Sequence, residues 1–280
     1  AGVAVWVATR GPGGAGEPGE AEVNVNVMAA GPGALASPLE GVRAVVIGAT
    51  GACGRFAVDG LVKSTAAAAV TTVVRRPTDF AEQFGWTAEE AAKHTQHVVD
   101  DFGSLSEHPA VWENHDVALC ALGTTRSAAG GADGFVRVDR DYVVAAAETA
   151  KAAGVRRFLL LTAQGSSGVP SFVPRWMVRA VHPMLYTQTK YEAEAAVRAT
   201  GFESISFFRP GLLDRRVPGA DHRTMERLFL KIVPSTKAAA VGHAMAEVAT
   251  TDPAAAVTAY STAAIAGLAK AYAARSADAE

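Results

Sequence analysis

The stretch VVIGATGACGRF, residues 45–56, joins a run of β-branched residues to a run with helical spacing through three glycines. Gly48, Gly51 and Gly54 are spaced so that the chain can turn tightly, approach a pyrophosphate with its backbone and pack a helix close behind. The first turn of that helix supplies free N–H groups for an anion. Spaced glycines also occur in ordinary tight turns, but the strand before them and the helix after them favour a dinucleotide-binding loop.

Short apolar runs alternate with helical segments along the chain from Val42 onward. Helical spacing is found at residues 54–64 and 138–154. The strand-like runs are continuous rather than alternating, which is typical of strands buried on both faces. The pattern predicts a doubly wound α/β fold with a parallel sheet, the Rossmann arrangement. The strand-like runs occupy residues 43–49, 69–76, 96–102, 116–123, 156–163 and 204–211.

The N-terminal part of the chain differs from this core. Residues 1–40 are rich in Ala, Gly and Pro and are predicted to be a disordered or linker-like extension. Met28 is interpreted as the true start, with the upstream residues an artefact of reading frame or fragmentation. A processed targeting peptide is the alternative, although Arg10 is the only basic residue in that stretch.

The dinucleotide-binding domain is expected to cover residues 41–216. Residues 217–280 are expected to form a smaller, mostly helical region on the substrate side, packed on the same domain. Within it, Thr251 or Asp252 is predicted to cap a helix. The apolar face of that helix is expected to consist of Val257, Tyr260, Ile265, Leu268 and Tyr272.

The net charge and the cysteine content of the chain argue against several classes of protein. The formal net charge is -2 and there is no basic block, which argues against a nucleic-acid partner. Cys53 and Cys120 are the only cysteines, so a disulfide framework is excluded and a cytoplasmic location is expected, with a mitochondrial or membrane-peripheral one as the alternative. The scattered histidines favour no metal site, and no apolar run is long enough to span a bilayer.

The nucleotide preference is predicted from the end of the second strand-like run. An NAD site places an Asp or Glu about 20 residues beyond the glycines to hold the ribose hydroxyls. This chain instead has Arg75 and Arg76, with Arg55 as a further candidate, which would bind a 2'-phosphate through charge-assisted hydrogen bonds. NADPH is therefore predicted rather than NADH, and a solvated basic strand end is the alternative.

The stretch LYTQTKYEAEA, residues 185–195, places Tyr186 and Lys190 one helical turn apart on the same face. Such a pair also occurs by chance on helix surfaces. When a carbonyl is reduced, negative charge develops on its oxygen, so a positioned phenol can donate a proton while a neighbouring ammonium stabilises the phenolate. Together with the glycine loop and the arginine pair, the spacing favours a catalytic role for both residues.

Five motifs that occur in order between residues 42 and 216 resemble one particular family. They are GATGACGR (48–55), LGTTR (122–126), FVRVDRDYV (135–143), YTQTK (186–190) and FRPGLL (208–213). In this order they are similar to hallmarks of the atypical short-chain dehydrogenases/reductases of the Tat-interacting-protein type, a group that includes a metastasis-suppressor oxidoreductase. The resemblance implies an NADPH-dependent oxidoreductase that acts on a small-molecule carbonyl or alcohol.

Site residues are carried over from the resemblance position by position. Catalysis would rest on Tyr186 and Lys190, and Lys190 would also bond the nicotinamide ribose. With the glycines and arginines named above included, the predicted cofactor-binding residues are Gly48, Thr50, Gly51, Ala52, Cys53, Gly54, Arg55, Arg75, Arg76, Leu122, Gly123, Tyr186, Lys190, Leu213 and Arg216.

A third catalytic hydroxyl normally comes from the end of the fifth strand, where family members often have two serines. This chain has Thr162 and Ala163 there, so Thr162 is the candidate and Ser166 the reserve. The missing hydroxyl at Ala163 leaves a second function open, an NADPH-binding regulatory or scaffold protein with little turnover. An accessory subunit of a larger mitochondrial complex is a further alternative, and protein partners or a homo-oligomer are expected.

The connection GVPSFVPRWMVRAVHPM, residues 168–184, is longer than its counterpart in shorter family members. It has an apolar side around Trp176, with Arg175 and Arg179 beside it. Because it leads directly to Tyr186, we predict a lid or wall of the substrate pocket. A membrane-surface or partner contact and plain packing are the alternatives.

Overall fold

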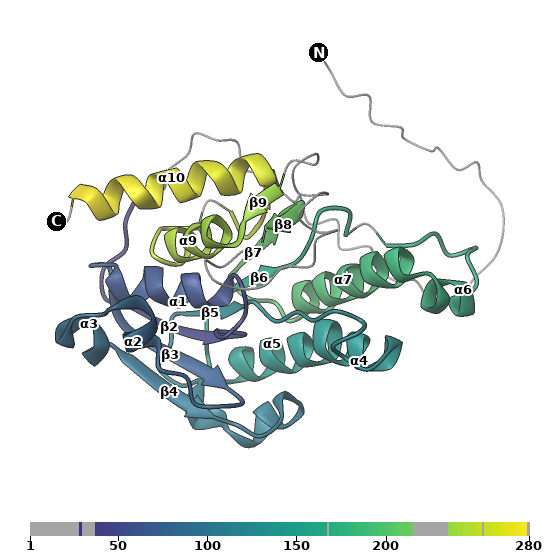
Figure 1. Cartoon of the computed structure of the whole chain (residues 1–280), viewed down its shortest axis with the longest axis horizontal. Coiled ribbons are helices and arrows are strands. Elements are labelled where there is room, and N and C mark those ends of the chain that lie inside the picture. The colour runs from purple at the N-terminus through teal and green to yellow at the C-terminus, as the bar shows by residue number, and fades with distance from the viewer. Residues whose placement is uncertain (1–27, 30–36, 167, 215–234, 254, 279–280) are drawn as a thin grey trace, which may run out of the picture.

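The computed structural model describes residues 28–29, 37–166, 168–214, 235–253 and 255–278. Its main sheet has eight parallel strands in the order β1-β10-β7-β6-β5-β2-β3-β4, so the predicted doubly wound parallel sheet is confirmed (Figure 1). A separate parallel pair joins β8 (Leu212–Asp214) to β9 (Ser235–Lys237). The strands of the main sheet are β1 (Met28–Ala29), β2 (Val42–Ile47), β3 (Ala67–Val74), β4 (His94–Val98), β5 (Val117–Cys120), β6 (Arg157–Leu161), β7 (Ser204–Arg209) and β10 (Val257–Ser261).

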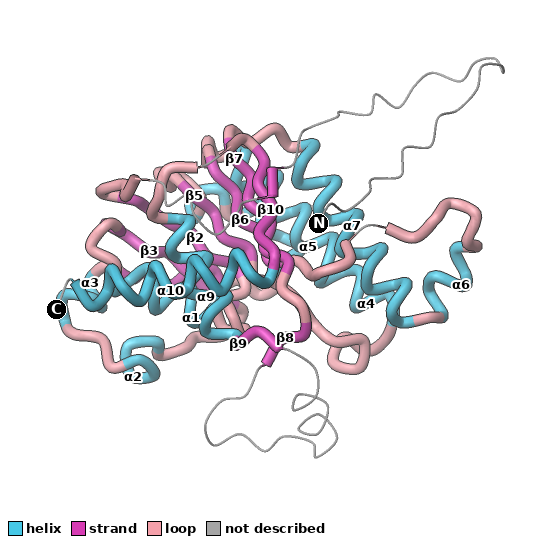
Figure 2. The backbone as a smooth tube through the Cα atoms, turned by 90° about the horizontal axis from the view of Figure 1, so that it is seen from above, coloured by secondary structure: helices cyan, strands magenta, loops and turns pink. Residues whose placement is uncertain are grey.

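Helices cover both faces of this sheet (Figures 1 and 2). On one face, α9 (Ala238–Ala249) packs against both α1 (Gly54–Lys63) and α10 (Thr262–Asp278). On the other face, α5 (Tyr142–Ala152) packs against α7 (His182–Ala199). The remaining helical segments are α2 (Phe80–Phe84), α3 (Ala88–Ala92), two 3-10 turns at Phe102–Glu107 and Pro109–Val111, α4 (Ala132–Val136), a π-helical turn (Arg137–Asp141) and α6 (Arg175–Ala180).

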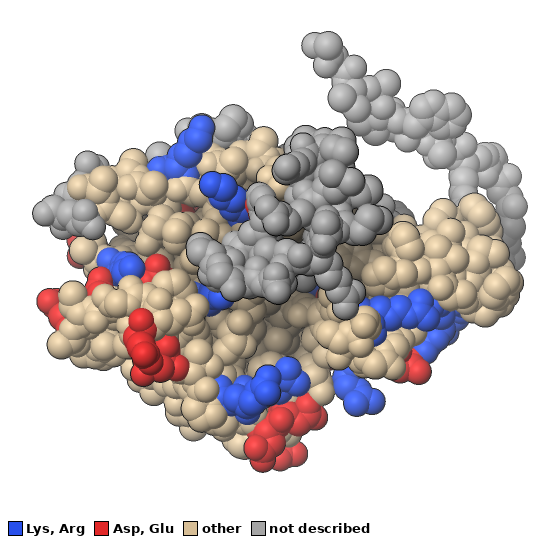
Figure 3. Space-filling model, in the orientation of Figure 1, with Lys and Arg blue, Asp and Glu red and all other residues tan. Residues whose placement is uncertain are grey.

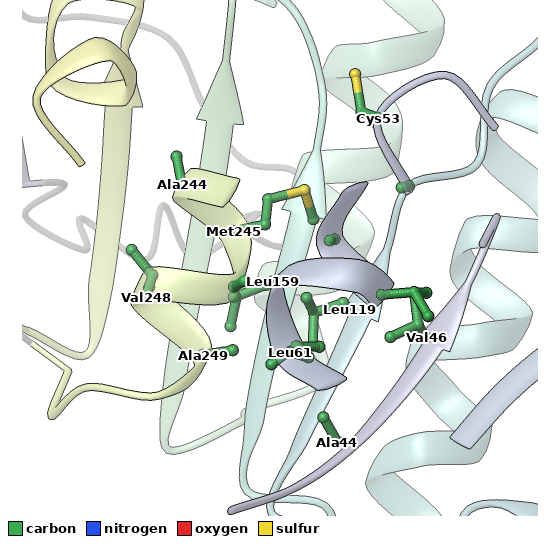
Figure 4. Packing of buried hydrophobic residues seen from close by; sticks show 14 of the residues in the cluster. Ala44, Val46, Cys53, Leu61, Leu119, Leu159, Ala244, Met245, Val248 and Ala249 are labelled. Carbon is green, nitrogen blue, oxygen red and sulfur yellow. The ribbon is translucent and has the colours of Figure 1, made fainter. Parts of the chain in front are cut away.

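The core lies in two layers, one on each side of the sheet. Val46 of β2 belongs to the cluster that contains Leu61 of α1 and Met245 of α9 (Figure 4). The next residue, Ile47, belongs to the opposite cluster, together with Val197 of α7. Because successive side chains of a strand point to opposite faces, the central strands are apolar at most positions on both faces. This accounts for the continuous apolar runs in the sequence.

The strand order reverses in the middle of the sheet, between β2 and β5. From β2 the chain runs outward through β3 and β4, and then crosses back to β5 and continues outward on the other side. The connections that leave β2 and β5 therefore diverge, which opens a crevice beyond the carboxyl ends of these two strands. That crevice is where the glycine loop lies.

The prediction that a helix begins at Thr251 or Asp252 is wrong for the first part of that segment. Residues Val257–Ser261 form β10, which pairs with β7, and α10 begins only at Thr262. Val257 and Tyr260 are buried in the sheet rather than on a helix face. The edge of β7 offers unpaired backbone groups, and a β-branched and aromatic segment satisfies them better as a strand than as a helix.

The prediction of a disordered extension over residues 1–40 is wrong where the structure describes that segment. Met28–Ala29 pairs in parallel with β10, and the backbone N–H of Leu39 donates to the carbonyl of Thr250 over 2.9 Å. The rest of the extension lies outside the described residues, as do Arg216 and the predicted domain boundary after it. Within the described ranges, no helix is both long and apolar enough to cross a membrane.

Candidate active site

The glycine loop closes tightly between the end of β2 and the start of α1. Gly48 has a φ of +80°, and a Cβ at this position would lie 2.6 Å from the carbonyl carbon of Ala121. A Cβ at Gly54 would lie 2.1 Å from the carbonyl oxygen of Gly48, and the N–H of Gly51 donates to that same oxygen over 3.0 Å. Side chains are therefore excluded at Gly48 and Gly54, which lets a ligand approach the backbone of the loop and the first turn of α1.

A cavity of about 580 Å³ lies in front of this loop. Its glycine cradle fits a dinucleotide, because no Cβ is tolerated at Gly48 or Gly54 and a helix begins beside it. It is also lined by Phe102, Arg137 and Tyr142, which were not predicted. The predicted cofactor residues that line it are Gly48, Thr50, Gly51, Arg75, Arg76, Leu122 and Gly123.

Four predicted cofactor residues lie beside the cavity but not in its lining. Cys53 and Gly54 are buried at the beginning of α1, and Ala52 is half-buried next to them. Arg55 is half-buried, and its guanidinium lies 5.3 Å from the centre of the Phe56 ring. The structure therefore does not bring Arg55 to the other two arginines.

The charged side chains in the described lining of this cavity are all basic. Arg75 and Arg76 are exposed after the end of β3, and Arg137 reaches the same cavity from the π-helical turn. None of the described residues that line this cavity is acidic. The nearby Asp101 accepts a hydrogen bond from the Tyr142 hydroxyl, which lowers the pKa of Asp101. The lining thus offers an anion three guanidinium groups and no competing carboxylate.

Lys190 is held as a buried ammonium. It is 5% exposed, and its Nζ lies 2.8 Å from Oδ1 of Asp139, which is 1% exposed. The other carboxylate oxygen of Asp139 accepts the backbone N–H of Thr124 over 2.9 Å. Burial would lower the pKa of Lys190, but the Asp139 carboxylate and the Tyr186 hydroxyl outweigh it and raise the pKa above its ordinary value. Lys190 therefore stays charged at neutral pH.

Tyr186 lies one turn before Lys190 and lines a second cavity, of about 690 Å³. The Tyr186 ring is half-buried, with its centre 5.9 Å from that of Phe135 and 6.3 Å from that of His182. Lys190 Nζ is 3.9 Å from the place a Cβ would occupy on Gly123, which lines the first cavity. The same face of α7 thus reaches from the second cavity, which Tyr186 lines, to Gly123 in the lining of the first.

The hydroxyls expected at the end of β6 are engaged elsewhere. Thr162 borders the second cavity, but its Oγ1 donates to Oε1 of Glu194 over 2.8 Å. The buried hydroxyl of Ser166 donates to the carbonyl of Ala163 over 2.7 Å. Ala163 lines the cavity without a hydroxyl. The structure therefore does not free either predicted hydroxyl for a substrate oxygen.

Asp139 and Glu194 are the buried carboxylates that sequence reasoning missed. Glu194 is 1% exposed and accepts hydrogen bonds from Arg209 and Arg198 as well as from Thr162. A signal for both was present. Asp139 lies inside the FVRVDRDYV motif, and Glu194 follows Lys190 at the same four-residue spacing that relates Lys190 to Tyr186.

The connection over residues 168–184 contributes only its end to the second cavity. His182 and Pro183 line that cavity, together with Leu213, whereas Phe172 and Trp176 are exposed to solvent. The lid or wall stays a prediction. Among the described residues, no group of His, Cys, Asp or Glu side chains is arranged to hold a metal ion.

Comparisons with known proteins agree with an NAD(P)-binding fold. The model of an NAD(P)H-binding family matches residues 48–252. The chain is 40% identical to Protein HTATIP2 of Rattus norvegicus over 168 residues, which is 60% of this chain and 61% of the relative. It is 33% identical to the mitochondrial protein fmp52 of Aspergillus clavatus over 169 residues, 60% of this chain and 65% of the relative. The matched stretch thus spans less than two thirds of the length of these relatives. The family resemblance expected from the motifs is confirmed.

Solved structures show the same fold at low sequence identity. A putative NAD-dependent epimerase/dehydratase from Bacillus halodurans superposes with a TM-score of 0.57 at 18% identity, covering 82% of this chain and 100% of that chain. A short-chain dehydrogenase/reductase from Serratia marcescens gives a TM-score of 0.58 at 16% identity, covering 80% of this chain and 97% of that chain. At such identities the likeness concerns the fold alone.

Proposed function

Because this chain belongs to the NAD(P)H-binding family, we propose that it is an NADPH-dependent oxidoreductase that transfers hydride to or from a carbonyl or alcohol. One observation carries the proposal. Helix α7 supplies Tyr186 to the lining of one cavity and brings Lys190 next to Gly123 in the lining of the other. Tyr186 would therefore act as a proton donor between a nucleotide-sized and a substrate-sized space.

Different residues of the first cavity would bind different groups of the cofactor. The backbone of the glycine loop from Gly48 to Gly54 and the start of α1 would bind the pyrophosphate. Arg75 and Arg76, with Arg137 in the same lining, would bind the 2'-phosphate that distinguishes NADPH from NADH, and the lack of an acidic residue in the described lining supports that preference. When bound, NADPH supplies the hydride.

The proton would come from Tyr186. Its hydroxyl donates to the substrate oxygen as negative charge develops there, and the Lys190 ammonium stabilises the phenolate that remains. Because Lys190 is buried, its attraction for the phenolate is stronger than it would be in water. Asp139 acts as a positioning residue, since it keeps the ammonium charged and fixes its place.

The second cavity indicates the substrate class. Its described lining is mostly apolar, with Pro183, Leu212 and Leu213 among its members, and contains no carboxylate, lysine or arginine. Such a surface would bind a substrate that is uncharged and largely apolar around its carbonyl group.

A second function is favoured by one specific observation. Thr162 donates its hydroxyl to Glu194, and Ala163 has no hydroxyl, so Tyr186 lacks the usual helper for a substrate oxygen. An NADPH-binding regulatory or scaffold protein with little turnover would tolerate this loss. In that role the protein would bind NADPH and engage protein partners, or further copies of itself, without reducing a substrate.

One experiment separates the two functions. NADPH binding is measured by calorimetry, and NADPH oxidation is then followed with a panel of apolar aldehydes and ketones, using Tyr186→Phe as the control. Turnover by the parent protein that falls in Tyr186→Phe supports the oxidoreductase. Tight NADPH binding with no turnover of any substrate would favour the regulatory protein, and absence of NADPH binding would contradict both.

We propose the cytoplasm as the compartment, with mitochondria as the alternative because the fmp52 relatives carry that word in their names. The two cysteines support a reducing environment. Both are buried, and they belong to core clusters on opposite faces of the sheet.

A further inference from the structure

The connection between β6 and α7 carries the most exposed large apolar side chains in the described part of the chain. Phe172 is 84% exposed and Trp176 is 69% exposed, and Val181 in the same connection is 39% exposed. Single exposed apolar residues are ordinary on protein surfaces, but three within ten residues, two of them large aromatics, mark a surface that contacts something.

Polar contacts hold this segment in place, together with partial packing of Met177 and Val178, which are half-buried. None of the six residues of α6 is buried, and a helix of this length is not stable by itself in water. Arg126 Nη1 donates to the carbonyl of Ala180 over 3.2 Å, and Arg179 forms an ion pair with Asp133. The helix is thus fixed to α4 and to the loop before it, while its aromatic side chain remains in solvent.

The segment is also basic. Residues 168–184 contain Arg175, Arg179 and His182 and no Asp or Glu. Asp133 offsets part of the charge of Arg179, whereas Arg126 adds a cation beside it. Figures 1 and 2 place α6 at one end of the molecule, and Figure 3 shows blue side chains bordering a tan area there.

We propose that this surface docks the protein on an anionic lipid bilayer. We call it the α6 surface, and it consists of Arg126, Phe172, Arg175, Trp176, Arg179 and Val181. Trp and Phe side chains partition into the boundary between headgroups and acyl chains, with the indole N–H facing water. Arginine side chains beside them reach the lipid phosphates while their apolar stems stay in contact with the acyl region.

A second copy of the chain is a poorer occupant for the α6 surface. A stable dimer needs about 800 Å² of buried surface from each partner. Fully buried Phe and Trp side chains contribute roughly 150 to 250 Å² each, so the two exposed rings supply at most about 500 Å² of that area. Two like-charged arginine clusters would also face each other across a two-fold axis.

The proposal is tested with the full chain and lipid vesicles, by co-sedimentation. We expect binding to phosphatidylcholine vesicles that contain phosphatidylserine, and weaker binding at high salt. Replacing both rings (Phe172→Ser with Trp176→Ser) should lower the partition coefficient more than tenfold. The matched control is Val98→Ser, which removes an exposed apolar side chain from the edge strand β4 and should leave binding unchanged.

The charge contribution is tested separately. Arg175→Gln should weaken binding to the phosphatidylserine vesicles about fivefold, since one cation near an anionic surface contributes on this scale. Lys270→Gln removes an equal charge from α10 and should have no effect. Each variant should keep the thermal unfolding midpoint of the parent, because none of the replaced side chains is buried.

Three outcomes would overturn the proposal. The first is that the parent protein does not bind the phosphatidylserine vesicles. The second is that the double variant without the two rings binds them as well as the parent does. The third is that the parent binds no vesicles but forms a dimer in light scattering, and that this dimer is absent in the double variant. The last outcome would identify the surface as an interface between copies. The vesicle measurement requires neither cofactor nor turnover, so its failure leaves the proposed oxidoreductase untouched.

Discussion

Lys190 and Asp139 form an ion pair of 2.8 Å that is almost completely shielded from water. The lysine comes from α7 and the aspartate from the π-helical turn before α5. A π-helical turn displaces one residue from the regular helix and is often found at functional sites. The pair thus connects α7, which also carries the predicted proton donor Tyr186, to the segment LGTTR after β5. Asp139 makes this connection because it also accepts the backbone N–H of Thr124 in that segment.

Replacing Asp139 by Asn should destabilise the protein by about 3 to 5 kcal/mol, because a buried ammonium would lose its counter-charge. Urea denaturation of the two proteins measures this. The control is Asp133→Asn, which breaks the exposed ion pair with Arg179 and should change the unfolding free energy by less than about 1 kcal/mol. Equal effects of the two substitutions would show that the Lys190 ion pair is not sheltered from solvent.

The same ion pair should make stability depend on alkaline pH. The pKa of Lys190 is raised on folding above its unfolded value of about 10.4. Its contribution is therefore fully present below that value and is lost as the pH rises through the higher folded pKa. Unfolding free energies measured from about pH 9 upward should fall more steeply for the parent than for Lys190→Met with Asp139→Asn. Parallel curves would contradict the raised pKa.

Arg75→Ala with Arg76→Ala should reduce NADPH affinity tenfold or more for each arginine, since a hydrogen bond to a charged group contributes roughly 1.5 to 3 kcal/mol. NADH affinity should stay nearly unchanged, because NADH lacks the 2'-phosphate. Calorimetry with both nucleotides gives the two constants, and Lys270→Ala is the control for a general charge effect. A parallel loss of NADH binding would assign the arginines to another part of the nucleotide.

The two positions at the end of β6, Thr162 and Ala163, should have different roles. Thr162→Val removes a donor from buried Glu194 and should lower the unfolding free energy by about 1 to 3 kcal/mol. Ala163→Ser places a hydroxyl in the cavity and should raise kcat for a carbonyl substrate about tenfold or more. If Thr162→Val instead abolished turnover in a stably folded protein, Thr162 would be the catalytic hydroxyl after all.

Gly54→Ala should destabilise the protein by about 1 to 3 kcal/mol and abolish NADPH binding, because the new Cβ would collide with the backbone of Gly48. Gly267 is the matched control, since it is also helical and nothing lies within 4 Å of a Cβ there. Gly267→Ala should stabilise α10 by up to about 1 kcal/mol. Thermal unfolding compares the two, and a well-tolerated Gly54→Ala would mean that the loop can open.

The strands, the glycine loop and the pair on α7 could be predicted because each signal lies within a short stretch of chain. Continuous apolar runs report strands buried on both faces, and Tyr186 and Lys190 share a face through helix geometry alone. The segment at Val257 could not be assigned this way, because its residues are compatible with a helix until the open edge of β7 offers them hydrogen-bond partners.

The amino-acid sequence by itself therefore determined the fold class, the position of the nucleotide crevice and the spacing of the candidate proton donor and its lysine. Only the tertiary structure decided that Asp139 pairs with Lys190 and that Glu194 takes the hydroxyl of Thr162. The reason is physical. Periodicity determines which side chains share a face within one element, whereas the partner of a buried charge is set by the packing of elements that are distant in the chain.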